Sequence, residues 1–163
     1  MAVVAMAKYG HAHHHKSSKK ATNEKLIQVL LDSGLDGDIL FHQKGKPKHF
    51  PYLTRQVPCS WHMLNEVFNT KGRGKLLIRF FEYSNSKEFL AELDVFEYDQ
   101  KMSKPVFDLI IGCNSMEKLG IVMDFKAKSI TIDEIILPMR SFANLTDKSK
   151  VKVECWIWIH HII

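Results

Sequence analysis

The sequence predicts an all-β, single-domain protein with one short helix toward the C-terminus. Short apolar runs recur along the chain with turn residues between them, and their β-branched and aromatic content favours strands. The length of 163 residues suits one domain with a real core and is too short for two ordinary ones. The predicted strands are "LIQVLLD", "DILF", "KLLIRFFEY", "EFLAELDVFEY", "VFDLIIG", "IVMDF" and "SITIDEII".

The helix is predicted over "NSMEKLG", residues 114–120. Asn114 or Ser115 can cap its first turn, and Glu117 lies near the helix start, where the dipole favours a negative charge. Gly120 is a plausible C-cap. The segment therefore predicts a helix of about two turns.

Two segments between the predicted strands indicate loops. The stretch "FHQKGKPKHFPYLTRQVP", residues 41–58, carries three prolines and many charges, so we expect a long surface loop. The stretch "NTKGRGK" places Gly72 and Gly74 between two apolar runs, which predicts a hairpin with a mobile tip.

The composition, with 45% hydrophobic and 25% charged residues, is ordinary for a globular protein. Lys and Arg number 23 against 18 Asp and Glu, which gives a net charge of +5, and much of the excess lies in the first 25 residues. The run "HAHHHKSSKK" is expected to be a solvated tail, although it could touch nucleic acid or bind a metal loosely. We expect no other contact with nucleic acid.

The three cysteines, Cys59, Cys113 and Cys155, are widely spaced and form no CxxC pair, which predicts a reduced, intracellular setting. The start "MAVVAMAKYG" is too short for a signal peptide, and the end "CWIWIHHII" is far short of the ~20 apolar residues of a membrane span. A cytoplasmic protein without a membrane partner is therefore expected.

The motifs of several enzyme classes are missing from the sequence. It contains no GxxxxGK phosphate loop, no GxGxxG, no HExxH and no GxSxG elbow. We therefore expect neither a cofactor nor a metal site.

An Asp-Ser-Gly triplet ends the first apolar run and precedes a turn. Asp32 is therefore interpreted either as a turn cap or as a catalytic acid. The catalytic carboxylate of an aspartic protease needs a neighbouring hydroxyl, backbone amides that hold it, and a glycine that allows a second carboxylate to approach. Ser33 and Gly34 fit these needs, and "LIIG" follows downstream, just before the predicted helix.

The segments "LLDSGLDGDIL" and "FDLIIGCNSMEKLGIVMDF" together resemble the retropepsins, the aspartic proteases of retroviruses and long-terminal-repeat retrotransposons. "WHMLNEVFNT" is similar to a transposon pattern at Trp61, Phe68 and Thr70, and "KSITIDEIILPMR" resembles the end of the protease core in gypsy-type elements. The resemblance covers residues 24–140, in the right order. It implies a protease domain over 24–140, a basic His-rich flexible tail over 1–23 and an extension over 141–163.

This resemblance implies a retropepsin-like acid-protease barrel that is active as a homodimer, because each chain carries one Asp-Ser-Gly triplet. Asp32 of each subunit would share one proton, and the pair would activate water to cleave an extended polypeptide without a covalent intermediate. The implied activity is an aspartic endopeptidase that processes a retroelement polyprotein. The implied setting is intracellular and includes virus-like particles.

The resemblance also assigns roles to the neighbours of Asp32. Ser33 would bond across the dimer and Gly34 would offer its backbone to the substrate, so both support the active-site loop. Asp36 matches the retroviral position that contacts the substrate backbone. A flap hairpin is expected over Trp61 to Thr70, where Asn65 replaces a glycine at a substrate-binding position; the alternative register places the tip at "KGRGK".

The sequence departs from the family pattern beside the catalytic residue. Leu35 replaces Ala or Thr, and Cys113 replaces the arginine that partners the carboxylate equivalent to Asp36. Substitute partners for Asp36 could come from Arg55, Arg73 or Arg79. These departures support an alternative function, a catalytically inactive dimerisation or peptide-binding domain from a degenerate retroelement copy.

Overall fold

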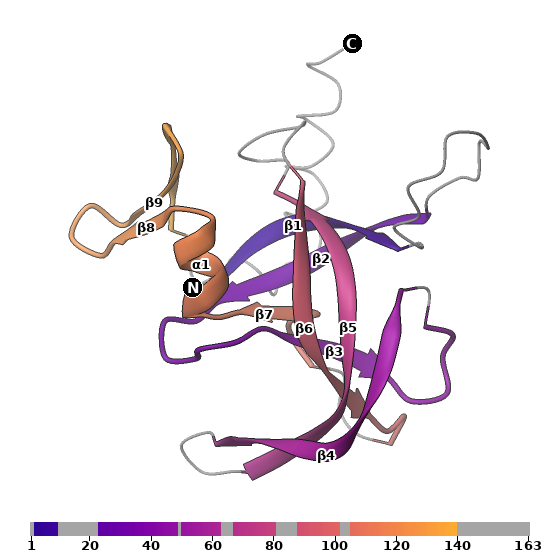
Figure 1. The fold of residues 1–163 in the computed structure, drawn as a ribbon. Helices are drawn as coiled ribbons and strands as arrows, with labels where there is room; N and C mark the ends of the chain where they lie inside the picture. The colour runs from indigo at the N-terminus through magenta and orange to yellow at the C-terminus, as the bar shows by residue number, and fades with distance from the viewer. Residues whose placement is uncertain are drawn as a thin grey trace.

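The predicted all-β class with one short helix is confirmed by the computed structural model, which describes residues 2–9, 23–48, 50–62, 67–80, 88–101 and 105–139. Most of the predicted apolar runs form strands (Figure 1). In chain order, the elements are β1 (Ala2–Tyr9), β2 (Asn23–Leu31), β3 (Ile39–Gln43), β4 (Tyr52–His62), β5 (Val67–Arg79), β6 (Phe89–Tyr98), β7 (Leu109–Ile111), α1 (Cys113–Lys118), β8 (Ile121–Asp124), β9 (Ser129–Ile132) and β10 (Ile135–Pro138).

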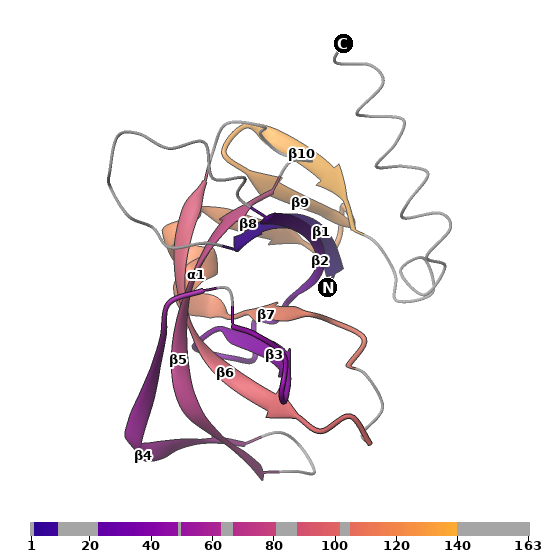
Figure 2. The same ribbon diagram turned by 90° about the vertical axis from the view of Figure 1, so that its right-hand side faces the viewer.

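The larger sheet closes on itself and forms the predicted barrel. Its strand order is β1-β2-β7-β3-β6-β5-β4, and β1 also pairs with β5. Because β1 has antiparallel ladders with both β2 and β5, the ring is complete, and β4 lies along β5 outside it. Figures 1 and 2 show β1 and β2 crossing the upper part of the long strands β5 and β6.

Strand β1 lies within residues 1–23, the segment expected to be a flexible tail. Ala2 to Tyr9 pair with β2 along their whole length, and Met6 to Lys8 also pair with β5. The first part of that segment therefore belongs to the barrel. The His-rich run and the expected C-terminal extension over 141–163 lie outside the described residues.

The alternation of side chains along β2 produces two apolar clusters. Ile27, Val29 and Leu31 are fully buried in the main core, whereas Leu30 packs against a second cluster on the other face. The second cluster is built on Leu35, Ile39 and Ile110, with Leu30, Phe41, Trp61, Phe68 and Phe96 packed against it.

The prediction of a long loop over 41–58 is wrong at both ends, because residues 41–43 belong to β3 and residues 52–58 form the start of β4. Proline is tolerated there because β4 is the edge strand of the sheet. Its pairing with β5 shifts register between Thr54 and Cys59, and Pro58 lies in this irregular stretch. The edge position thus accommodates a residue that cannot donate to a ladder.

The hairpin predicted at "NTKGRGK" is also wrong, because Gly72 and Gly74 lie inside the continuous strand β5. A Cβ on Gly72 would overlap the Tyr52 ring, and a Cβ on Gly74 would lie 2.9 Å from the Phe50 ring. Aromatic side chains from outside the strand occupy the space beside both glycines. This result removes the alternative flap register at "KGRGK".

Helix α1 begins one residue earlier than expected and is capped differently. Gly112 is the N-cap, no side chain caps the helix, and Ser115 lies inside the first turn. Glu117 lies in the second half of the helix, not near its start. Gly120 follows the last turn with φ of +62° and donates its amide to the Glu117 carbonyl, as its predicted role requires.

A small second sheet follows the helix. Strands β8, β9 and β10 form an antiparallel sheet in the order β10-β9-β8. The run "SITIDEII", predicted as one strand, is divided into β9 and β10 by a turn at Asp133, whose φ is +55°. Figure 2 shows this sheet above β1 and β2.

Proline substitutions in β1 test the closure of the barrel. Ala7 lies opposite Lys25 on one side and Ile78 on the other, whereas Ala2 pairs with Leu30 alone. We expect Ala7→Pro to lower the free energy of unfolding by about 2 kcal/mol, because a strand flanked on both sides loses a ladder bond. Urea titration measures this change.

The matched control is Ala2→Pro, at the first residue of β1, where we expect a change within about 0.5 kcal/mol. Equal effects of the two substitutions would contradict the closed ring.

Candidate active site

Strand β7 lies between β2 and β3, and this arrangement positions the Asp-Ser-Gly triplet. β7 is parallel to β2 and antiparallel to β3, and the Asp32 amide extends the first ladder by donating to the Ile111 carbonyl over 3.0 Å. The segment that joins β2 to β3, residues 32–38, is called the Asp32 loop below. It therefore lies at the end of β7, where the chain enters α1.

Asp32 caps its own turn with one carboxylate oxygen. Oδ1 accepts the Gly34 amide over 2.9 Å, and the Asp32 carbonyl accepts the Leu35 amide over 3.3 Å. The side chain is partly exposed, and the described residues donate nothing to Oδ2. The interpretation of Asp32 as a turn cap is confirmed by the bond to Gly34, while its role as a catalytic acid stays a prediction.

The Asp32 loop wraps the start of α1. The Leu35 carbonyl accepts the Cys113 amide over 2.7 Å, and the Asp36 carbonyl accepts the Asn114 amide over 3.0 Å. The Cys113 thiol in turn donates to the Ser33 carbonyl over 3.1 Å. Backbone carbonyls of the loop thus satisfy amides that the helix itself leaves free.

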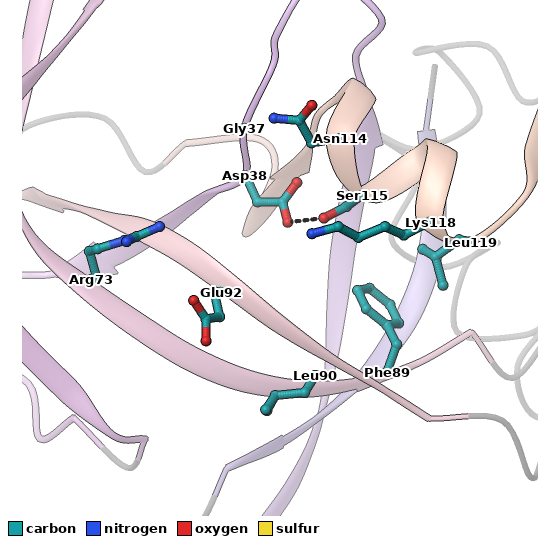
Figure 3. A pocket seen from close by; sticks show the side chains of 10 residues that line it. All are labelled: Gly37, Asp38, Arg73, Phe89, Leu90, Glu92, Asn114, Ser115, Lys118 and Leu119. Carbon is teal, nitrogen blue, oxygen red and sulfur yellow. Dashed lines mark hydrogen bonds between the residues drawn. The ribbon is translucent and has the colours of Figure 1, made fainter.

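Asp38 closes the loop against the helix, and sequence reasoning missed it. Its Oδ1 accepts the Gly112 amide over 3.0 Å and its Oδ2 accepts the Ser115 hydroxyl over 2.5 Å (Figure 3). The residue is 4% exposed. Burial raises the pKa of the Asp38 carboxyl, although the hydrogen bonds from Ser115 and Gly112 oppose that rise. The signal in the sequence that could have identified Asp38 is its place as an acidic residue immediately before the apolar residues of β3.

Gly112 brings two backbone segments into direct contact. A Cβ there would lie 2.5 Å from the Leu35 carbonyl oxygen and nearer still to that of Gly37. Only glycine fits a position with so little space, and the neighbouring atoms belong to the backbone, which cannot rotate away. The glycine of "LIIG" is therefore required for the loop to dock on the helix.

The other predicted site residues have different environments. Ser33 is exposed, and its hydroxyl has no partner among the described residues. Asp36 is also exposed, so the desolvation penalty expected for a partly buried carboxylate does not arise. Asn65 lies outside the described residues.

The arginines considered as partners for Asp36 lie elsewhere. Arg55 and Arg73 both contact Asp94, with Nη2 of Arg55 lying 2.5 Å from Oδ1 and Nε of Arg73 lying 3.8 Å from it. Arg79 ends β5, opposite Met6 of β1. Asp36 thus gains no cationic partner from Arg55 or Arg73.

The hairpin of β4 and β5 extends beneath the Asp32 loop in the view of Figure 1. Trp61 pairs with Phe68 and His62 with Val67, so the chain turns within the segment predicted as a flap. The Trp61 indole donates to the Thr70 hydroxyl over 3.2 Å. The tip, residues 63–66, lies outside the described residues.

Leu35 belongs to the Asp32 loop, and its side chain is buried. It is 9% exposed and belongs to the cluster against which Trp61 and Phe68 pack. Its side chain therefore adds apolar volume to the cluster that includes the hairpin aromatics.

A separate pocket of about 340 Å³ lies between α1 and strands β5 and β6 (Figure 3). Asp32, Ser33 and Gly34 do not line it. It is therefore not the site of the chemistry considered for Asp32. Its lining residues are Gly37, Asp38, Arg73, Phe89, Leu90, Glu92, Asn114, Ser115, Lys118 and Leu119.

The described residues contain no group of three or more His, Cys, Asp or Glu side chains that could hold a metal ion. Within the same part of the chain, no helix has the length and apolarity needed to cross a membrane.

The comparison with solved structures finds several similar chains. No protein-family model matches the sequence, and no curated protein matches it. The chain is similar to the crystal structure of the retroviral protease-like domain of Ddi1 from Leishmania major, with 23% sequence identity and a TM-score of 0.45. The match covers 72% of this chain and 90% of that one.

Substitution of Gly112 tests the docking of the loop on the helix. We expect Gly112→Ala to lower the free energy of unfolding by about 3 kcal/mol, because the new methyl group overlaps backbone carbonyls that cannot move aside. Urea denaturation followed by circular dichroism measures the loss.

The control is Gly120→Ala, where nothing lies within 4 Å of a built Cβ and only the positive φ opposes the change. We expect a cost of about 1 kcal/mol there. A smaller cost at Gly112 than at Gly120 would contradict the close packing.

The raised pKa of Asp38 predicts a pH-dependent contribution to stability. The folded chain binds this proton more tightly than the unfolded chain, whose reference pKa is 3.8. The contribution is therefore fully present below the unfolded pKa and is lost as the pH rises through the folded pKa. We expect the unfolding free energy of the wild type minus that of Asp38→Asn to decrease as the pH rises.

Urea titrations at a series of pH values measure this difference, and Asp99→Asn, which alters an exposed carboxylate, is the control. A difference that stays constant or grows with pH would count against the assignment.

Proposed function

We propose that the chain is an aspartic endopeptidase that acts as a homodimer and processes a retroelement polyprotein. The observation that carries the proposal is the state of Asp32. Its carboxylate is held by the Gly34 amide through Oδ1, while Oδ2 receives no donor from the described residues. The motif resemblance described above supplies the substrate class.

A second copy of the chain is required because Asp32 stands alone. The described acidic neighbours Asp36 and Asp38 are respectively exposed and bonded to Gly112 and Ser115, so neither completes a pair with Asp32. Two Asp32 carboxylates about 3 Å apart would share one proton, because like charges at that distance do not both ionise. The site is incomplete in a single chain.

The chemistry then follows from the shared proton. The ionised Asp32 takes a proton from a water molecule, and the protonated Asp32 donates to the carbonyl oxygen of the scissile peptide bond. The activated water adds to the carbonyl carbon, and collapse of the resulting diol releases the amine after it gains a proton. No covalent intermediate with the enzyme forms.

The neighbours of Asp32 have supporting roles in this proposal. The exposed Ser33 hydroxyl would bond across the two-fold axis. An extended substrate would lie between the loop and the hairpin, in contact with the Gly34 backbone, Asp36 and Asn65.

A second candidate function is peptide binding or dimerisation without cleavage. Leu35 favours it, because this side chain is larger than the Ala or Thr of the family pattern and is buried in the cluster against which Trp61 and Phe68 pack. A site narrowed in this way would hold a chain without accepting it in a cleavable position.

Replacement of Asp32 separates the two functions. We expect the purified wild type to cleave an unstructured apolar peptide at mildly acid pH and to be blocked by a statine-type inhibitor. Asp32→Asn should lower kcat/KM by at least about 10³-fold, because the general base is lost. Cleavage followed by mass spectrometry measures the change.

The control is Asp99→Asn, an exposed carboxylate paired with Lys44, which should leave cleavage unchanged. Analytical ultracentrifugation completes the test. A dimer without activity supports the binding function, and a strictly monomeric wild type contradicts both.

A further inference from the structure

Asp94 is a second buried carboxylate, and it lies away from Asp32 on strand β6. It is 6% exposed. The Arg55 guanidinium covers it through two contacts, Nη2 to Oδ1 at 2.5 Å and Nη1 to Oδ2 at 3.2 Å. The contact to Oδ2 is a hydrogen bond, whereas Oδ1 accepts no hydrogen bond from the described residues and is compensated by the nearby positive charge alone.

The same carboxylate holds the hairpin. The Trp61 indole Nε1 donates to Oδ2 of Asp94 over 3.1 Å. The far edge of that indole lies against the Asp32 loop, since a Cβ built on Gly37 would be 3.0 Å from Cη2 of Trp61. Trp61 also stacks on Phe68 of the opposite hairpin strand, at 6.5 Å between ring centroids. The position of the indole therefore determines how the hairpin meets the loop.

The backbone of Asp94 holds the Asp32 loop, on the other side of the contact between the hairpin and this loop. Its amide donates to the Asp38 carbonyl over 2.9 Å, at the end of the Asp32 loop. Asp94 also pairs with Ile39 of β3 and Arg73 of β5. One residue is thus bonded to the loop through its backbone and to the hairpin through its side chain.

We propose that Asp94, supported by Arg55, is a positioning residue that sets the β4–β5 hairpin against the Asp32 loop. The structural effect of Asp94, the position of the hairpin against the loop, does not depend on catalysis. The kinetic effect of Asp94, a change in substrate affinity, rests on the proposed peptidase function. Asp94 does not touch the reacting atoms in this proposal and acts through Trp61.

Three substitutions separate the parts of this arrangement. Trp61→Phe removes the indole donor and keeps an aromatic ring. Arg55→Gln leaves the Asp94 carboxylate buried without its closest cation, whereas Asp94→Asn keeps an acceptor for Trp61 but loses the ion pair. The double variant of Arg55 and Asp94 should be less perturbed than Arg55→Gln alone, because it leaves no buried charge unpaired.

The control is Lys75→Gln, which breaks the exposed ion pair between Lys75 of β5 and Glu92 of β6. It removes a charge pair between β5 and β6, and neither residue takes part in the contacts of Arg55 and Trp61 with Asp94. Any effect common to this variant and to Arg55→Gln arises from the loss of a charge pair in the sheet and not from the loss of the hairpin contact.

Hydrogen exchange of the full chain, measured by mass spectrometry, tests the structural consequence. We expect Trp61→Phe and Arg55→Gln to raise exchange in the paired ends of the hairpin, residues 59–62 and 67–70, by about tenfold or more. Exchange in β2 and β7 should stay unchanged. No change in the hairpin, or an equal rise throughout the barrel, would overturn the proposal, since the second result describes general destabilisation.

Steady-state cleavage tests the kinetic consequence. We expect Asp94→Asn to raise KM by about tenfold with kcat within about threefold of the wild type, because a misplaced hairpin weakens binding more than it alters the Asp32 pair. A loss confined to kcat would overturn the positioning role. If the wild type cleaves nothing, the peptidase function fails, and the exchange measurement still decides whether Asp94 positions the hairpin.

Discussion

The contact between Gly112 and the backbone of Leu35 and Gly37 is the constraint on which the rest of the site depends. It exists because β7 runs between β2 and β3, so that the loop joining those two strands must pass over the start of α1. No side chain can separate the two segments there. The loop carbonyls consequently reach the first amides of the helix, and Asp32 is fixed at the end of β2 by the Ile111 carbonyl.

Three carboxylates surround this contact, and their environments give them different capacities. Asp38 is buried and bonded to the amide and hydroxyl at the helix start, and Asp94 is buried and paired with a guanidinium. Both of these carboxylates hold neighbouring segments in place. Asp32 alone is partly exposed with an oxygen that the described residues leave unbonded. Solvation and hydrogen bonding, more than position in the sequence, thus distinguish the candidate catalyst from its structural neighbours.

The sequence predicted those parts of the molecule that depend on local pattern. Most strands, the helix and its terminal Gly120, and the Asp32 turn all follow from neighbouring residues. The errors involve partners distant in the chain. Gly72 and Gly74 indicated a turn because the rings of Tyr52 and Phe50 beside them cannot be inferred from the local sequence. Asp38 and Asp94 were missed for the same reason, since their partners at Ser115 and Arg55 lie 77 and 39 residues away.

The departures from the retropepsin pattern differ in their physical consequences. Cys113 stands where the pattern that the sequence resembles has an arginine, but Asp36 is exposed and water can solvate it, while the Cys113 thiol bonds to the Ser33 carbonyl. The charge change is therefore accommodated within the chain. Leu35 is different, because it is buried in the apolar cluster against which Trp61 and Phe68 pack, and a buried side chain must be fitted among its neighbours. Packing at Leu35, more than the absence of a cation at position 113, is therefore the departure with the larger physical consequence.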